Sequence, residues 1–238
     1  MKRAVAITAS IKRYLMAIEG LEGSTAPERM CFVWGMPGAG KTTATAFVVN
    51  RTNGVFVRAQ RIWNISSMLS AIVEQLEGQP GRYKQPMFDF IVKKLRCSQR
   101  SLFVDEADYL NESMIEVLRD IHDLSGRPVT LIGMDEVRRG LVQNERFMRR
   151  ITEEIKFMPM DLNDCMAVYR AVAEVEIEPA LLSALNEEAG GNVGLIVNGI
   201  GMIEKVAKSN GWPVATLALW NNGSKSTRKF FFNNNGVK

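Results

Sequence analysis

The sequence predicts an α/β protein with a three-layer αβα core on a parallel five-stranded sheet, followed by a small C-terminal all-helical region. Up to about residue 160, short apolar segments alternate with helical stretches, and beyond Pro159 only helical stretches follow. Such alternation is typical of parallel sheets covered by helices on both faces. We therefore expect a core with an N-terminal helix in residues 1–160, a helical region in 161–221, and a disordered basic tail in 222–238.

The predicted strands are short apolar runs bounded by turn residues or charges. The first ends in glycine, the second follows the turn signal Asn53-Gly54, and the third runs directly into an aspartate. In chain order the five strands are Met30–Trp34, Val55–Val57, Ser101–Val104, Val129–Ile132 and Glu154–Phe157.

The predicted helices have apolar residues at helical spacing. One, within Ala4–Ile18, precedes the core, and we expect it to pack against the core. The others in the core are Thr42–Asn50, Ser66–Leu76, Met87–Leu95 and Ser113–Leu124. The C-terminal region contains Asn163–Val172, Pro179–Ala189 and Val193–Ala207.

Composition excludes several classes of function. The apolar stretches are short and broken by charge, which argues against a membrane span or a membrane partner. Three widely separated cysteines argue against a disulfide framework, and we expect a cytoplasmic protein. His122 is the only histidine, which argues against a zinc site or a Ser-His or Cys-His catalytic unit.

A phosphate-binding loop joins the first strand to the following helix. The string Gly35-Met36-Pro37-Gly38-Ala39-Gly40-Lys41-Thr42 fits the pattern G-x-x-x-x-G-K-[ST], which is a strong signal in a strand-to-helix connection. Its glycines let backbone N–H groups surround the phosphates of ATP at the positive end of a helix. We expect these eight residues and Thr43 to bind ATP, with Lys41 also catalytic through the β- and γ-phosphates.

Two carboxylates follow the third strand, at the edge where ligands bind in open α/β sheets. Asp105, together with the hydroxyl of Thr42, is expected to hold Mg²⁺, and Glu106 is expected to polarise the attacking water. A kinase that phosphorylates a small molecule does not need a water-activating glutamate, so Glu106 favours hydrolysis. Asp108 is interpreted as a helix N-cap rather than a third catalytic acid.

The order of these motifs resembles a P-loop AAA+ ATPase with a small helical lid. More narrowly, residues 25–210 resemble the transposition ATPases of the phage Mu B, TnsC and TniB type. The narrower resemblance depends on the segment Val129–Gly133, on Leu141, Phe147 and Arg149-Arg150-Ile151, and on the lid segment Gly190–Ile196.

This resemblance implies that ATP lies between subunits and that an arginine of the neighbouring subunit completes the site. An arginine finger stabilises charge on the γ-phosphate oxygens. Arg150 is the first choice, followed by Arg149 and Arg146, with a solvated basic helix end as the alternative for each.

Two positions depart from the wider AAA+ pattern. Met134 stands where a polar sensor residue is often found, and Gly194 stands where many lids carry an arginine. We therefore expect slow hydrolysis that depends on assembly, DNA or a partner.

The resemblance also implies double-stranded DNA, bound without strong sequence preference by an oligomer or filament. Residues 1–160 contain 23 Lys and Arg against 18 Asp and Glu, an excess that is compatible with a polyanion. Arg58 and Arg61 are the expected DNA contacts. A second basic run is formed by Lys93, Lys94, Arg96 and Arg100, of which Lys93 and Lys94 fit a solvated helix face. Because little chain precedes residue 25, we expect DNA contact from the ATPase domain or the tail.

The leading functional hypothesis is an ATP-dependent DNA-binding AAA+ ATPase that assembles on target DNA and recruits or activates a transposase-like protein. The alternative is a helicase-loader-like or secretion-associated AAA+ ATPase that acts on a protein partner. A third hypothesis, a scaffold that binds ATP without hydrolysing it, is disfavoured by Glu106.

Overall fold

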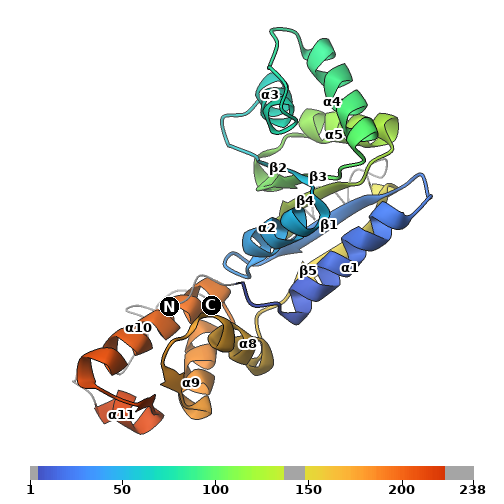
Figure 1. The fold of residues 1–238 in the computed structure, drawn as a ribbon. Helices are drawn as coiled ribbons and strands as arrows, with labels where there is room; N and C mark the ends of the chain where they lie inside the picture. Colours follow the sequence, from blue (N-terminus) through green and yellow to red (C-terminus); the bar gives the residue numbers. More distant parts are fainter. Residues whose placement is uncertain (1–4, 137–147, 223–238) are drawn as a thin grey trace. The chain divides into compact units, whose positions relative to one another are not determined.

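A computed structural model describes residues 5–136 and 148–222 of the chain (Figure 1). The described residues form two units, which we treat separately. The core unit consists of residues 10–36, 41–136 and 148–157, and the C-terminal unit contains residues 5–9, 37–40 and 158–222. Arg146, Leu141, Phe147 and the tail beyond residue 222, all named in the sequence analysis, lie outside the described residues.

The core unit is built on a parallel sheet with strand order β2-β3-β4-β1-β5. β4 therefore lies between β1, which leads into the glycine-rich loop, and β3, which leads into the acidic pair. The strands are β1 (Met30–Gly35), β2 (Val55–Arg58), β3 (Leu102–Asp105), β4 (Val129–Gly133) and β5 (Ile151–Phe157).

Helices cover both faces of this sheet, and the alternation of strand side chains assigns them to the two faces (Figure 1). Met30 and Phe32 of β1 and Leu102 and Val104 of β3 belong to a buried cluster with residues of α3, α4 and α5. The intervening residues, such as Phe103, are equally buried and point to the other face. The strands are apolar on both faces because both faces are covered.

The helices of the core unit begin and end at recognisable signals. Asn64 caps α3 by accepting from Ser67 N, and Asn111 caps α5 by accepting from Met114 N, while Gly126 ends α5 in the left-handed conformation. The elements are α1 (Ala9–Gly23), α2 (Lys41–Thr52), α3 (Ile65–Gln75), α4 (Lys84–Ser98), the short 3-10 helix η1 (Ala107–Tyr109) and α5 (Glu112–Ser125).

The C-terminal unit has its own apolar core, which includes Leu181, Leu185, Ile200 and Trp220. Within the lid segment, Gly190 ends α9 in the left-handed conformation and Asn192 caps the next helix. The elements are α8 (Leu162–Val172), β6 (Glu176–Ile177), α9 (Pro179–Ala189), α10 (Val193–Asn210), β7 (Val214–Ala215) and α11 (Leu217–Asn222).

The predicted fold class is confirmed, and the five predicted strands are present. The structure adds a short parallel pair, β6 with β7, to the region that was expected to be purely helical. The N-terminal helix packs into the core as expected, since Tyr14 and Ile18 are fully buried and Tyr14 meets Phe157 edge to face. No helix among residues 5–136 and 148–222 is long and apolar enough to cross a membrane.

Candidate nucleotide site

The candidate site lies at the carboxyl edge of the sheet, where the parallel strands end together. β1 ends at Gly35, β2 at Arg58, β3 at Asp105 and β4 at Gly133. Ligands of open α/β sheets bind at this edge because the connections from strands to helices gather there. The strand order therefore brings four connecting segments, far apart in sequence, to one place.

The glycines of the loop are required by its backbone. Gly35 has φ 152°, and a Cβ atom there would lie 2.5 Å from the carbonyl oxygen of Phe157 on β5. Gly38 and Gly40 are left-handed, with φ of 77° and 87°. Side chains are disfavoured in this conformation, so the turn from β1 into α2 depends on glycine. A loop of this kind leaves backbone N–H groups available at a helix N-terminus, which suits phosphate.

Lys41 is the first residue of α2 and points back over the loop. Its Nζ donates to the carbonyl oxygens of Gly35, at 2.7 Å, and Met36, at 3.1 Å. Burial lowers the pKa of Lys41, and the nearby carboxylates of Asp108, Asp105 and Glu106 act in the opposite direction. The electrostatic environment of the predicted phosphate-binding lysine thus includes all three acids of the third connection.

Thr42 and Asp105 are in direct contact. The Thr42 hydroxyl donates to Asp105 Oδ2 at 2.9 Å, and Asp105 is almost fully buried. The structure thus brings together the two residues that were predicted to share Mg²⁺. A hydroxyl and a carboxylate are oxygen ligands of the kind that Mg²⁺ prefers, so the pair fits this ion.

Arg58, predicted to contact DNA, lies beside the same carboxylate. The β2–β3 register places Arg58 opposite Asp105, and Arg58 Nε is 3.5 Å from Asp105 Oδ2. The Arg58 side chain remains 53% exposed. The residue therefore lies at the nucleotide site and at the surface. Arg61 is exposed in the turn that follows β2.

Glu106 follows β3 in an unusual conformation. Its backbone is left-handed, with φ 56° and ψ 41°, although it carries a side chain. Its N–H donates to Asp105 Oδ1 at 3.0 Å, and its carbonyl accepts from Tyr109 N at 3.0 Å. Strained residues of this kind are concentrated at functional sites.

The interpretation of Asp108 as a helix N-cap is wrong. Asn111 caps α5, and Asp108 lies within η1, where both of its carboxylate oxygens accept from Met134 N, at 3.1 and 3.2 Å. Asn111 is the N-cap because α5 begins at the residue that follows it. Sequence reasoning missed the true partner of Asp108, since a contact across 26 residues depends on strand order.

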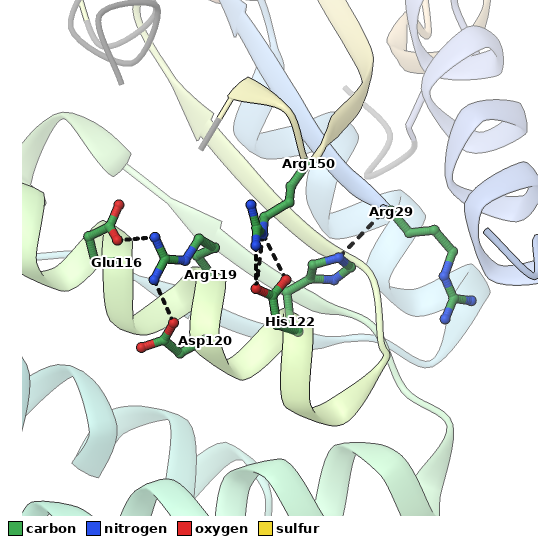
Figure 2. A network of polar contacts seen from close by, with 7 residues as sticks. Arg29, Glu116, Arg119, Asp120, His122 and Arg150 are labelled. Atoms are coloured by element: carbon green, nitrogen blue, oxygen red, sulfur yellow. Dashed lines mark hydrogen bonds and ion pairs between the residues drawn. The ribbon is translucent and has the colours of Figure 1, made fainter. Parts of the chain in front are cut away.

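Arg150, the first choice for the arginine finger, lies at the opposite, amino edge of the sheet (Figure 2). Its carbonyl accepts from Met30 N at the start of β1. Its Nε and Nη2 donate to the Asp123 carboxylate at 2.8 to 2.9 Å, and these hydrogen bonds raise the pKa of Arg150. The structure therefore does not bring Arg150 to the loop of its own chain. Arg149 is exposed beside it.

His122, also in Figure 2, has a structural environment. It is fully buried, and its Nε2 accepts from Arg29 N at 3.3 Å. Nε2 therefore carries no hydrogen, and Nδ1 donates to the Arg127 carbonyl at 2.8 Å. The imidazole therefore joins the segment before β1 to the segment before β4.

The residues of the second basic run have two kinds of environment: the arginines bind carbonyl oxygens and the lysines face solvent. Arg100 donates to the carbonyls of Asn53 and Gly54, and Arg96 donates to the Leu124 carbonyl. Lys93 and Lys94 are exposed on α4, as expected of a solvated face. Thr43 is exposed in the first turn of α2.

Comparisons with known proteins agree with this site. Residues 25–141, which contain the loop and the acidic pair, match the model of the AAA domain family. A relative from Haemophilus influenzae, the Mu-like prophage FluMu DNA transposition protein B, is 28% identical over 174 residues. The match covers 67% of this chain and 60% of the relative, so the chain spans about three fifths of that protein.

Similar solved structures share the fold. The ORC2 protein of Aeropyrum pernix has 16% identity and a TM-score of 0.67, over 89% of this chain and 64% of that one. The RuvB Holliday junction branch migration motor of Thermotoga maritima has 17% identity and a TM-score of 0.59, over 87% and 64%. These findings are consistent with the predicted AAA+ type of protein: residues 25–141 match the AAA domain family, and the chain is similar to a phage transposition protein B.

Proposed function

We propose that this protein is an ATP-dependent, sequence-tolerant DNA-binding ATPase that assembles on target DNA and recruits or activates a transposase-like partner. The observation that carries the proposal is the similarity to a DNA transposition protein B, in a chain whose loop and acidic pair meet at one edge of a sheet. ATP acts in this proposal as the switch for assembly.

The residues of the loop bind the nucleotide. Backbone N–H groups of residues 38–42 hold the phosphates at the start of α2. The Lys41 ammonium exchanges its carbonyl acceptors, Gly35 O and Met36 O, for phosphate oxygens.

Thr42 and Asp105 are the residues that would hold Mg²⁺. The ion neutralises charge on the phosphate oxygens when it is bound. Asp105 is kept in place by its hydrogen bonds from the Thr42 hydroxyl and the Glu106 amide.

Glu106 is the proposed catalytic base. It orients and polarises the water that attacks the γ-phosphate, and a carboxylate just beyond the strand end suits that role. Its left-handed backbone is unfavourable for a residue with a Cβ atom, so the surrounding structure holds it in place.

A neighbouring subunit supplies the missing positive charge. Arg150 precedes Ile151, which pairs with Met30 at the amino edge, whereas the loop begins at Gly35, roughly 16 Å away along β1. The guanidinium can therefore reach a γ-phosphate only in a second copy of the chain. The positions of Met134 and Gly194 support slow hydrolysis by one subunit alone.

Arg58 provides a physical link between DNA and the nucleotide. Its half-exposed guanidinium faces Asp105, and a DNA phosphate that attracts Arg58 would withdraw a cation from the magnesium-binding carboxylate. Arg58 and Arg61 would contact phosphates rather than base edges, which gives sequence-tolerant and salt-sensitive affinity. This link supports stimulation of the ATPase by DNA.

Electron microscopy and phosphate release test the proposal together. With ATP, the protein is expected to coat plasmid DNA, and DNA is expected to increase phosphate release. Glu106→Gln should retain the DNA coat and lose hydrolysis. Bare DNA under all nucleotide conditions would refute the DNA-binding part, and a stimulation by protein partners alone would favour the helicase-loader-like or secretion-associated alternative.

A mixing experiment tests Arg150. Lys41→Ala and Arg150→Ala are each expected to be inactive, but their mixture should recover part of the activity. A Lys41→Ala subunit can donate its Arg150 to an intact loop in the neighbouring Arg150→Ala subunit. Recovery should disappear when Lys41→Ala is replaced by the double variant, and an Arg150→Ala protein with full activity alone would exclude this finger.

A further inference from the structure

The carboxylate of Asp108 extends the pairing of two strands beyond the end of their backbone ladder. The last paired residues of β3 and β4 are Val104 and Leu131. Past that point, both oxygens of Asp108 accept from the Met134 amide, at 3.1 and 3.2 Å. A side chain thus ties the segment after β3 to the segment after β4.

This tie holds the segment that contains Glu106. Glu106 is left-handed, which is unfavourable for a residue with a Cβ atom, and it is followed directly by the η1 turn in which Asp108 lies. Within that turn, Tyr109 N donates to Glu106 O and Leu110 N donates to Ala107 O. Ala107 is buried, so its packing holds the turn in place. The hydrogen bonds of Asp108 hold the turn as well.

We propose that Asp108 is a positioning residue for ATP hydrolysis: its bond to the Met134 amide holds the turn that aims Glu106 at the attacking water. The proposal rests on the proposed function of Glu106 as the catalytic base. It also assigns a role to the β4 end, where Met134 contributes its backbone N–H rather than a polar side chain. Asp108 therefore influences the step of water attack more than the binding of ATP.

Two substitutions and a matched control test this role. Asp108→Ala removes both acceptors, whereas Asp108→Asn keeps one oxygen that can accept from Met134 N. Asp89→Ala is the control, because Asp89 is an exposed aspartate of the same unit whose carboxylate accepts a side-chain hydrogen bond from Gln85.

Phosphate release and the affinity for a fluorescent ATP analogue are measured for each variant, with hydrogen exchange of the Met134 amide. Asp108→Ala is expected to lower kcat roughly 10- to 100-fold, since a small displacement of a catalytic group has effects of that size. The analogue should bind within about threefold of the parent protein, because the loop is unchanged. Asp108→Asn should recover part of kcat, and Met134 should exchange faster in Asp108→Ala than in Asp89→Ala.

Three results would overturn the proposal. One is an unchanged kcat in Asp108→Ala while Glu106→Gln is inactive. This result would exclude the positioning role of Asp108 and leave Glu106 as the catalytic base. Another is an equal loss of kcat and analogue binding without recovery in Asp108→Asn, which indicates general damage to the fold. A Glu106→Gln protein that hydrolyses ATP normally would refute the catalytic base and, with it, the positioning role.

Discussion

The two edges of the five-stranded sheet carry basic residues for different reasons. At the amino edge, helices end before strands begin: α2 ends before β2, α4 before β3, and α5 before β4. At the carboxyl edge, helices begin after strands. Helix ends expose carbonyl oxygens and helix starts expose N–H groups, so the amino edge attracts cations and the carboxyl edge attracts anions.

Arginines at the amino edge complete the fold. Arg100 donates to the turn that follows α2, Arg29 donates to the Ser24 carbonyl at 2.8 Å and to the Gly126 carbonyl, and Arg127 donates to Gln99. Each guanidinium satisfies backbone or side-chain oxygens of the connection beside it. These positive charges are explained without a ligand.

Lys41 at the carboxyl edge also donates to two carbonyl oxygens, of Gly35 and Met36, but the electrostatics of its position differ. It is the first residue of α2, where the positive end of the helix dipole disfavours a cation. Arg58 similarly lies beside the buried Asp105 while half of its side chain faces solvent. Cations in these places are compatible with an anionic ligand, and the comparison teaches that the place of a basic residue on the sheet is more informative than its contribution to net charge.

Lys41→Ala is expected to have the largest effect on activity and almost none on stability. Removal of one charged donor from a transition state costs on the order of 10²- to 10³-fold in kcat. Phosphate release and thermal unfolding would be measured on the same samples. Lys94→Ala, which removes an exposed lysine that lies over the Phe90 ring, is the control and should change neither quantity. A large fall in Tm for Lys41→Ala would contradict a purely functional role.

His122→Ala should reverse this pattern, with a large loss of stability and little effect on the activity of the folded protein. The substitution leaves the Arg29 amide and the Arg127 carbonyl without their buried partner and opens a cavity, which together cost roughly 2–4 kcal/mol. Denaturant unfolding measures the loss.

His122→Asn is the matched variant for this prediction. Its side-chain amide can replace the Nδ1 donor to Arg127, but its Oδ1 does not occupy the position of Nε2, the acceptor for Arg29 N, so its stability should be intermediate. If His122→Ala lost ATPase activity at temperatures well below its Tm, the assignment of a structural role to the amino edge and a functional role to the carboxyl edge would be wrong.

The sequence predicted the buried strands well and the edge strand less completely. β1 and β4 are apolar on both faces, so their runs stand out. β5 begins at Ile151, three residues before the predicted start, because its first half is an exposed edge with polar side chains at Thr152 and Glu153. β6 and β7 have two residues each, too few for any periodic pattern.

The loop and the acidic pair were predictable because their residue types carry the chemistry at fixed spacing. The contacts of Arg58 with Asp105 and of Asp108 with Met134 were not, because they depend on which strands are neighbours and in which register. The left-handed backbone of Glu106 likewise follows from its tertiary surroundings rather than from its residue type.

Arg58→Met should have a smaller effect, on the magnesium dependence of nucleotide binding. Loss of a partly exposed positive charge beside Asp105 is expected to strengthen the binding of Mg²⁺ by roughly two- to fivefold, in line with exposed ion pairs. Binding of a fluorescent ATP analogue would be titrated with Mg²⁺.

Arg61→Met provides the comparison for Arg58. Both variants should lower DNA affinity and reduce the slope of its salt dependence by about one. Only Arg58→Met should change the magnesium titration. Equal titrations for the two variants would show that Arg58 does not connect the DNA surface to the nucleotide site.

Asp123→Asn should have the smallest effect. It tests whether Arg150, at the amino edge, has a structural or a catalytic role. Its ion pair with Arg150 is partly exposed, at 29% and 35% for the two side chains, so its loss should cost less than about 1 kcal/mol of stability. Because the pair holds Arg150 within its own subunit, the variant should also reach half-maximal ATPase activity at a protein concentration up to about fivefold lower. Asp120→Asn, which weakens one ion pair of Arg119 on the same helix and leaves its pair with Glu116, should leave that concentration unchanged. An activity loss in Asp123→Asn equal to that of Arg150→Ala would mean that the pair must stay intact for catalysis, and Arg150 would then belong with the structural arginines of the amino edge.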